Sequence, residues 1–287
     1  MAVHDVEASQ TPFIKNLASS DRRLRTQSLA ALHAYLSSRT RLTDLDATRL
    51  WTGLFWALWM TDRVRPQAKL ADELADLVFA FTRPEHPSQI PQDAAPTSPD
   101  KSAPQAQLQT SSPLDASSLQ DLSTTWLRAG WSVLSTNWSR IDALRLDKFL
   151  LLARRLLAAH LRLASHPPLL HVLRTHVLDV ADETGVALGL RLHVLDIWVD
   201  ELERIGALKP AAPDMAEGAD QQDARKDGEA ESRLARAVGD AVDEVASSRV
   251  KSVRARAEES SRDERLPWVG VTTVMDDGAQ DWDGFDD

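Results

Sequence analysis

A stripe of cationic side chains is the first candidate for chemistry in this sequence. Lys148, Arg155 and Arg162 recur every seven residues inside a helix predicted over 140–164. Each seven-residue step drifts by only about 20° around an α-helix, so the three side chains share one side, which we expect to lie opposite much of the apolar face. Such a stripe can bind phosphate oxygens, and acidic partner surfaces are the next option. An ordinary solvated face is the alternative interpretation.

A second cationic cluster, Arg22, Arg23 and Arg25, stands at the start of a helix predicted over 21–37. Like the stripe, this cluster can hold phosphates, and its alternative interpretation is also a solvated helix face. Both groups are therefore candidate residues for binding RNA or a protein partner.

Three histidines come close together in the sequence but do not predict a metal site. His166, His171 and His176 are spaced by five, which sets successive side chains about 140° apart on a helix. A pair of prolines also follows the first of them. Because their imidazoles do not converge on one point, no metal ion is expected.

Paired carboxylates are a weak candidate for acid–base catalysis. Asp142 and Asp147 resemble such a pair, but Arg145 and Lys148 lie close enough along a helix to neutralise them. The sequence also lacks the phosphate-binding, dinucleotide-binding, zinc-protease and serine-hydrolase motifs. We therefore predict a protein without catalytic residues and without a cofactor.

Nine tryptophans are the most unusual feature of the composition. Two of them, Trp268 and Trp282, lie in the sequences LPWVGV and DWDGFDD, which offer no core for them to enter, so we expect tail motifs that dock on a partner. The others lie at helical spacing beside leucine and phenylalanine, which favours core packing over stacking on bases. These seven are Trp51, Trp56, Trp59, Trp126, Trp131, Trp138 and Trp198.

Charge and composition limit the class of protein. The chain has 287 residues, with 33 basic and 43 acidic side chains and a net charge of −10, which argues against a uniformly basic nucleic-acid binder. Residues 207–287 hold 11 of the basic and 20 of the acidic residues. Cysteine is absent, which removes disulfides, thiolate catalysis and cysteine zinc sites. With no signal peptide and no apolar run of about 18 residues, a soluble intracellular protein is expected.

Composition also divides the chain. Prolines gather over 83–122 among small and polar residues, with almost no large apolar side chain, so this insert is expected to be disordered. We therefore predict one helical domain over 11–206 that the insert interrupts. A linker over 207–229, an amphipathic helix over 230–261 and an acidic disordered tail over 262–287 are expected to follow.

Apolar residues at helical spacing predict an all-α fold. Thr43 with Asp46 resembles a capping box, and Gly206 is a typical glycine after a helix end. The helix that follows Thr43 has almost no polar face and is expected at the centre. Antiparallel helical pairs with short loops predict a HEAT-like α-solenoid or a helical bundle. The predicted helices cover 11–19, 21–37, 44–61, 66–81, 123–138, 140–164, a segment from 167, and 188–205.

Two runs of sequence resemble a known family. W-x-G-L-F-x-x-x-W-M-x-D spans residues 51–62, and R-I-D-x-L-R-L-D-K-F spans 140–149. With the segments 17–36 and 189–207, they resemble the nucleolar ribosomal RNA-processing protein 1 family, the Nop52 domain proteins of eukaryotes. The proline-rich insert and the short acidic tail depart from the pattern of that family.

The resemblance implies a non-catalytic assembly factor of the large (60S) ribosomal subunit precursor, located in the nucleolus of the nucleus. It would support pre-rRNA processing by scaffolding protein and rRNA contacts. Its implied partners are the assembly factors and pre-rRNA of that particle, with no membrane, cofactor or small-molecule substrate. The alternatives are an α-solenoid adaptor that binds only proteins and, less favoured, a hydrolase with scattered acidic residues.

Overall fold

The computed structural model describes residues 16, 17, 19, 21–81, 116–208 and 219–269, and every regular element in these ranges is helical. The predicted all-α class is therefore confirmed. Most of the helix expected over 11–19 lies outside the described residues. The elements are α2 (Arg22–Ser37), α3 (Asp44–Trp59), α4 (Val64–Asp76), η1 (Leu77–Phe81), α5 (Ala116–Asn137), η2 (Trp138–Arg140), α6 (Leu146–Leu163), α7 (Pro167–Val172), η3 (Leu173–Val177, a π-helical turn), α8 (Leu188–Ile205), α9 (Ala219–Val245) and α10 (Lys251–Ser260).

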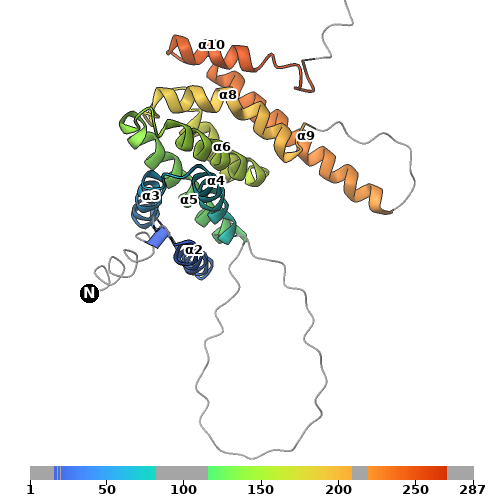
Figure 1. Cartoon of the computed structure of the whole chain (residues 1–287). Coiled ribbons are helices and arrows are strands. Elements are labelled where there is room, and N and C mark those ends of the chain that lie inside the picture. Colours follow the sequence, from blue (N-terminus) through green and yellow to red (C-terminus); the bar gives the residue numbers. More distant parts are fainter. Residues whose placement is uncertain (1–15, 18, 20, 82–115, 209–218, 270–287) are drawn as a thin grey trace, which may run out of the picture.

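The helices pack in two series. In one, α3 packs on α5 and α5 on α7, and in the other, α4 packs on α6, α6 on α8 and α8 on α10. Successive helices therefore alternate between two layers, an arrangement typical of stacked helical hairpins (Figure 1). Among the helices of the described ranges, none combines the length and apolar character that crossing a bilayer needs.

Local capping groups fix the helix ends that the sequence predicts. The Thr43 hydroxyl accepts a hydrogen bond from the Asp46 amide at 3.1 Å and starts α3. Gly206 has a φ of 91° and ends α8 in the left-handed conformation, which glycine adopts without strain. Both boundaries follow directly from residue type.

α3 contributes one buried side to the core through its contact with α5, and α6, which packs between α4 and α8, contributes a larger buried side. Trp51 and Trp126 face each other with ring centroids 5.1 Å apart, between α3 and α5. Gly130 makes this close approach possible, because a Cβ atom there would lie 2.8 Å from the Trp51 ring. Core packing is confirmed for four tryptophans that are fully buried, and the other three of the seven are partly buried against the same core. The buried four are Trp51, Trp126, Trp131 and Trp198.

The C-terminal region differs from the expected single helix over 230–261. The structure has α9 and α10 instead, with a turn between them. Ser248 is buried in that turn, its hydroxyl accepts from the Val250 amide, and its main-chain oxygen accepts from Arg254 at 2.7 Å. Such local serine contacts compete with helical hydrogen bonds and interrupt the helix.

Two expected boundaries also move. α5 begins at Ala116, inside the insert expected over 83–122, and α9 begins at Ala219, inside the expected linker. Residues 82–115 lie outside the described ranges, and the elements before and after them, η1 and α5, pack on each other. Phe81 of η1 lies edge-on to Trp126 of α5, with ring centroids 6.0 Å apart. The two helical blocks are thus joined by core packing.

Candidate nucleic-acid interface

The cationic cluster at the start of α2 lies beside the first turns of α4. Arg22 and Arg25 line a hollow together with Arg65 and Lys69 of α4. Glu73 is the one carboxylate that lines this hollow in the described part of the chain, and it pairs with Lys69 at 3.1 Å. Four cations beside one carboxylate make the hollow electropositive.

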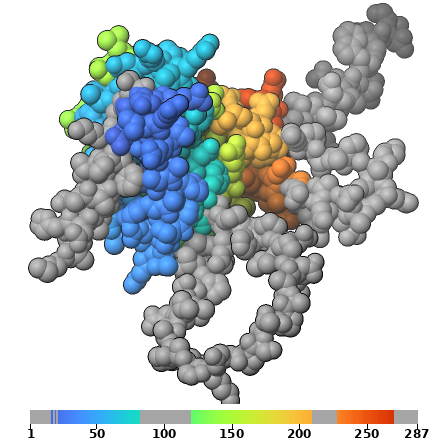
Figure 2. All heavy atoms as spheres, turned by 60° about the horizontal axis from the view of Figure 1, so that its bottom comes forward, coloured from blue at the N-terminus to red at the C-terminus, as the bar shows by residue number. Residues whose placement is uncertain are grey.

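A second hollow continues this surface. Arg25 and Pro66 line both hollows, and Arg63, Met60 and Asp62 line the second one. In the space-filling view of Figure 2, α2, in dark blue, lies at the front of the molecule. We define the α2–α4 basic surface as Arg22, Arg23, Arg25, Arg63, Arg65 and Lys69.

Local contacts position part of this surface. Asp21 caps α2 by accepting from the Arg23 amide at 2.8 Å, and the Arg25 guanidinium donates to the Ser19 main-chain oxygen at 2.7 Å. Arg22 and Arg23 are exposed, as are Arg63 and Arg65. Among the described residues these four make no ion pair, so their charge is available to an anionic ligand.

The stripe expected on α6 is not a continuous solvent-facing surface. Lys148 is buried, and its ammonium donates to the main-chain oxygens of Trp59 at 2.7 Å and Thr61 at 2.9 Å. Burial lowers the pKa of Lys148. The expected exposure of this residue is therefore wrong.

The other two stripe residues face neighbouring helices to different degrees. Arg155 forms an ion pair with Asp72 of α4 at 2.6 Å, whereas Arg162 is exposed. Burial raises the pKa of Asp76, also on α4, and the charges of Arg162 and Arg155 oppose that rise. The seven-residue spacing is real, but α6 packs against both α4 and α8, which occupy much of the side assigned to solvent.

The end of α3 and the segment 140–149 pack on each other. Phe149 stacks on Phe55 with ring centroids 4.5 Å apart. The Arg145 guanidinium lies 4.8 Å from the centre of the Trp59 ring, and Arg140 lies 5.6 Å from that of Trp56. The two sequence runs that carry the family resemblance therefore meet in space.

Three of the residues considered for catalysis or metal binding, Asp142, His166 and His176, contact other side chains. Arg145 pairs with Asp142, as the spacing predicts. His176 hydrogen-bonds to the Ser132 hydroxyl at 2.7 Å. Within the described ranges, no group of histidine, aspartate and glutamate side chains could hold a metal ion.

His160 is a buried histidine that the sequence reasoning did not single out. Trp131 donates its indole N–H to Nδ1 of His160 at 3.1 Å, and Nε2 of His160 lies 2.8 Å from the Leu169 main-chain oxygen. Burial lowers its pKa to about 4, so the ring is neutral and donates to Leu169. Both ring nitrogens are satisfied, which makes it a packing residue.

Trp268 does not lie in a free tail. Its ring packs on Gly239 of α9, where a Cβ atom would lie 2.5 Å from Cζ2 of the tryptophan. The Arg236 guanidinium lies 4.9 Å from the centre of the same ring. The expectation that Trp268 has nothing to pack on is therefore wrong, because α9 provides a groove at a glycine. Trp282 lies outside the described residues.

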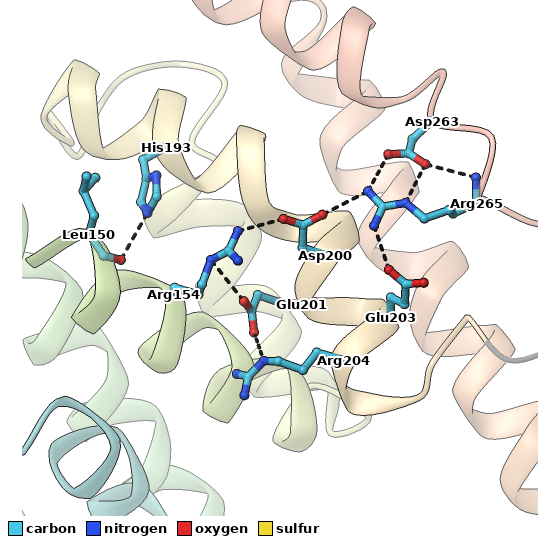
Figure 3. Close-up of polar contacts among 9 residues, drawn as sticks. All are labelled: Leu150, Arg154, His193, Asp200, Glu201, Glu203, Arg204, Asp263 and Arg265. Carbon is cyan, nitrogen blue, oxygen red and sulfur yellow. Dashed lines mark hydrogen bonds and ion pairs between the residues drawn. The ribbon is translucent and has the colours of Figure 1, made fainter. Parts of the chain in front are cut away.

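Ion pairs hold the segment after α10 against α8 (Figure 3). Arg265 donates to Glu203 at 2.7 Å, to Asp200 at 3.0 Å and to Asp263 at 2.7 Å. Asp200 also accepts from Arg154 of α6 at 2.7 Å. Burial raises the pKa of Asp200, but the hydrogen bonds from Arg265 and Arg154 outweigh it and hold that pKa below its usual value. Residues 262–269 are thus part of the folded body.

Comparisons with known proteins identify similar sequences. A family model described as "Nucleolar protein, Nop52" matches residues 8–281. The chain is 26% identical over 211 residues to mouse Ribosomal RNA processing protein 1 homolog A, covering 69% of this chain and 35% of that protein. For the human homolog B, the identity is 25% over 214 residues, which cover 70% of this chain and 23% of that protein. For the Caenorhabditis elegans homolog, the identity is 24% over 213 residues, which cover 71% of this chain and 45% of that protein. Each alignment therefore spans less than half of the relative's length.

Proposed function

Because the chain belongs to the Nop52 family of nucleolar proteins, we propose that it is a nucleolar factor in ribosomal RNA processing. The names of its relatives in mouse, human and C. elegans support this role. We further propose that it acts as a non-catalytic scaffold on the precursor of the large ribosomal subunit. Two layers of stacked helices suit that task, since such stacks offer extended binding faces.

The α2–α4 basic surface carries the RNA part of this proposal. Five of its six cations line the two hollows, and Arg23 follows Arg22 at the start of α2, in a chain whose net charge is −10. Arginine binds phosphate oxygens through paired donors, and helix N-termini favour anions. Four phosphate contacts to single-stranded RNA would give a slope of log affinity against log salt of about −3. Such a contact positions a protein on RNA without binding it tightly alone.

A binding experiment with the full chain tests the RNA contact. The probe is a fluorescent single-stranded transcript of a pre-rRNA internal spacer. Arg22→Glu with Arg65→Glu is expected to weaken binding at least about tenfold and to make the salt slope shallower by about 1 to 2. Arg249→Glu with Lys251→Glu changes the same charge at exposed positions near the start of α10 and should stay within about twofold. Unchanged affinity in the first variant, or equal losses in both, would overturn the assignment.

Sedimentation tests the proposed association with the precursor of the large ribosomal subunit. The tagged full chain should migrate with precursors of the large subunit on a sucrose gradient and should be nucleolar in cells. Migration in a small complex free of RNA would favour the protein-only adaptor instead.

A further inference from the structure

We propose that a surface over the end of α3 docks a segment of a protein partner that carries aliphatic side chains and carboxylates. This α3-end surface consists of Trp56, Trp59, Met60, Arg140, Leu144 and Arg145. The inference names one protein contact of the scaffold proposed above and so rests on that function. Of its residues, Met60 also lines the second hollow beside Arg25 and Arg63, and the other five line neither hollow.

Packing holds the surface in one conformation before any partner arrives. Lys148 binds the main-chain oxygens of Trp59 and Thr61, and Phe149 stacks on Phe55, so segment 140–149 is fixed against the end of α3. A surface that is already ordered loses little conformational entropy on binding.

Apolar side chains project from both contacting segments. Leu144 is 95% exposed and Met60 is 64% exposed, whereas most large apolar residues of the described chain are buried. Each lies next in sequence to a residue that makes the packing contacts, Arg145 and Trp59. Methionine, tryptophan and arginine are enriched in the centres of protein interfaces, where a buried apolar anchor contributes most of the affinity.

One cation beside these anchors is available to a carboxylate of a partner. Arg140 is exposed and lies over Trp56, and no carboxylate of the described chain pairs with it. Arg145 already pairs with Asp142, which leaves Arg140 as the cation available to a partner. The Nη1 group of Arg140 donates to Asn137 Oδ1 at 3.4 Å, and its other N–H groups can bind a carboxylate.

RNA fits this surface less well than protein does. Arg145, Trp56 and Phe55 lie against the Trp59 ring, which leaves less of it for a base to stack on. Leu144 has no side-chain donor or acceptor for a phosphate or a base. The observations therefore favour a protein segment.

The acidic tail of this chain is a less suitable occupant than a separate protein. Residues 270–287 hold six aspartates and no basic residue. However, the last described residue, Val269, follows α10, and α10 packs on α8 at the opposite end of the helix series from α3 (Figure 1). The partner proposed here is another chain, and the crosslinking experiment below distinguishes it from the tail.

Photo-crosslinking of the full chain in cells tests the proposal. A benzoylphenylalanine is placed at Leu144, with the same probe at Leu188, which is 48% exposed on α8, as a matched control. We expect crosslinked peptides from another protein, with at least two carboxylates and an aliphatic residue near the crosslink, at the first position only. Crosslinks to RNA, to residues 270–287 of this chain, or at the level of the Leu188 probe would each overturn the proposal.

A substitution separates this result from the RNA contact. Leu144→Asp should remove crosslinking from a probe at Met60 by at least about tenfold, while leaving the melting temperature and the affinity for the spacer transcript unchanged. Persistent crosslinking would contradict the proposed docking. Transcript binding by the variant with both Arg22→Glu and Arg65→Glu tests the proposed RNA function. Its result does not bear on docking at the α3-end surface.

Discussion

The Lys148 ammonium donates hydrogen bonds to the main-chain oxygens of Trp59 and Thr61, at 2.7 and 2.9 Å. α3 ends at Trp59, so the last carbonyl groups there have no partner within the helix. A cation at this place also complements the negative end of the helix dipole. Lys148 therefore ties the start of α6 to the end of α3.

Lys148→Glu is expected to lower the free energy of unfolding by about 3 kcal/mol or more, because it buries a carboxylate against two carbonyl oxygens. Arg162→Glu makes the same charge change at an exposed position of the same helix and should cost less than about 1 kcal/mol. Urea unfolding of both variants measures the difference. Similar small losses would show that the ammonium is dispensable.

His160 is expected to make stability depend on pH. Its folded pKa of about 4 lies below the ordinary value of 6.5, so the unfolded chain binds more protons between these values. Stability should therefore fall as pH drops from about 6.5 to 4, by roughly 3 kcal/mol for this residue. Urea unfolding at several pH values measures the slope.

The variant His160→Gln should flatten that slope, since glutamine can replace both hydrogen bonds without titrating. His33→Gln, at an exposed position, should leave it unchanged. Burial also lowers the pKa of His176 and His193, so part of the slope should remain in the His160 variant. An unchanged slope in His160→Gln would contradict the assignment.

Gly239→Ala should loosen the segment after α10, because the added Cβ would lie 2.5 Å from the Trp268 ring. We expect a loss of about 1 to 3 kcal/mol from overpacking and faster tryptic cleavage after Arg265. Gly228→Ala, in the same helix with no neighbour within 4 Å, should instead stabilise it by about 0.5 to 1 kcal/mol. Native-state proteolysis followed by mass spectrometry compares the two, and equal cleavage rates would count against the Trp268 contact.

Deleting residues 86–112 should leave the melting temperature and the helical circular dichroism per folded residue almost unchanged. Packing of Phe81 on Trp126 joins the flanking elements, and each halving of a loop changes its closure free energy by only about 0.6 kcal/mol. Loss of helical signal would mean that the deleted residues contain a structural element.

Residue type and spacing were sufficient to predict the helical fold of the main body. Thr43 and Gly206 mark helix ends through contacts within a few residues, so the sequence alone identifies them. The periodicity of apolar residues does not predict the turn at Ser248. That turn depends on a contact from Arg254 and on the burial of the serine, which only the folded structure shows. Local signals thus predicted local structure.

The candidate site was predicted only in part. Arg22 and its neighbours are adjacent in sequence and were found, whereas Arg65 and Lys69 join them only through the packing of α4 beside α2. The R-V-R-P run over 63–66 indicates a helix that starts with cations, but it does not indicate that this start lies beside α2. The predicted exposure of Lys148 is wrong because helical spacing gives only the side of α6 on which a residue lies. It does not show which neighbouring elements cover that side.

The packing of α10 on α8 has a consequence for where this chain can be shortened. Val253 and Ala257 are buried, while charged residues of α10 face outwards. Stacked helical proteins need such a terminal element with a polar outer side to stay dissolved. A chain ended at Gly206 would leave the side of α8 that α10 covers bare, and a second molecule could add to it. α10 therefore serves as a terminal cap, which covers α8 with its buried side and presents charged residues to solvent.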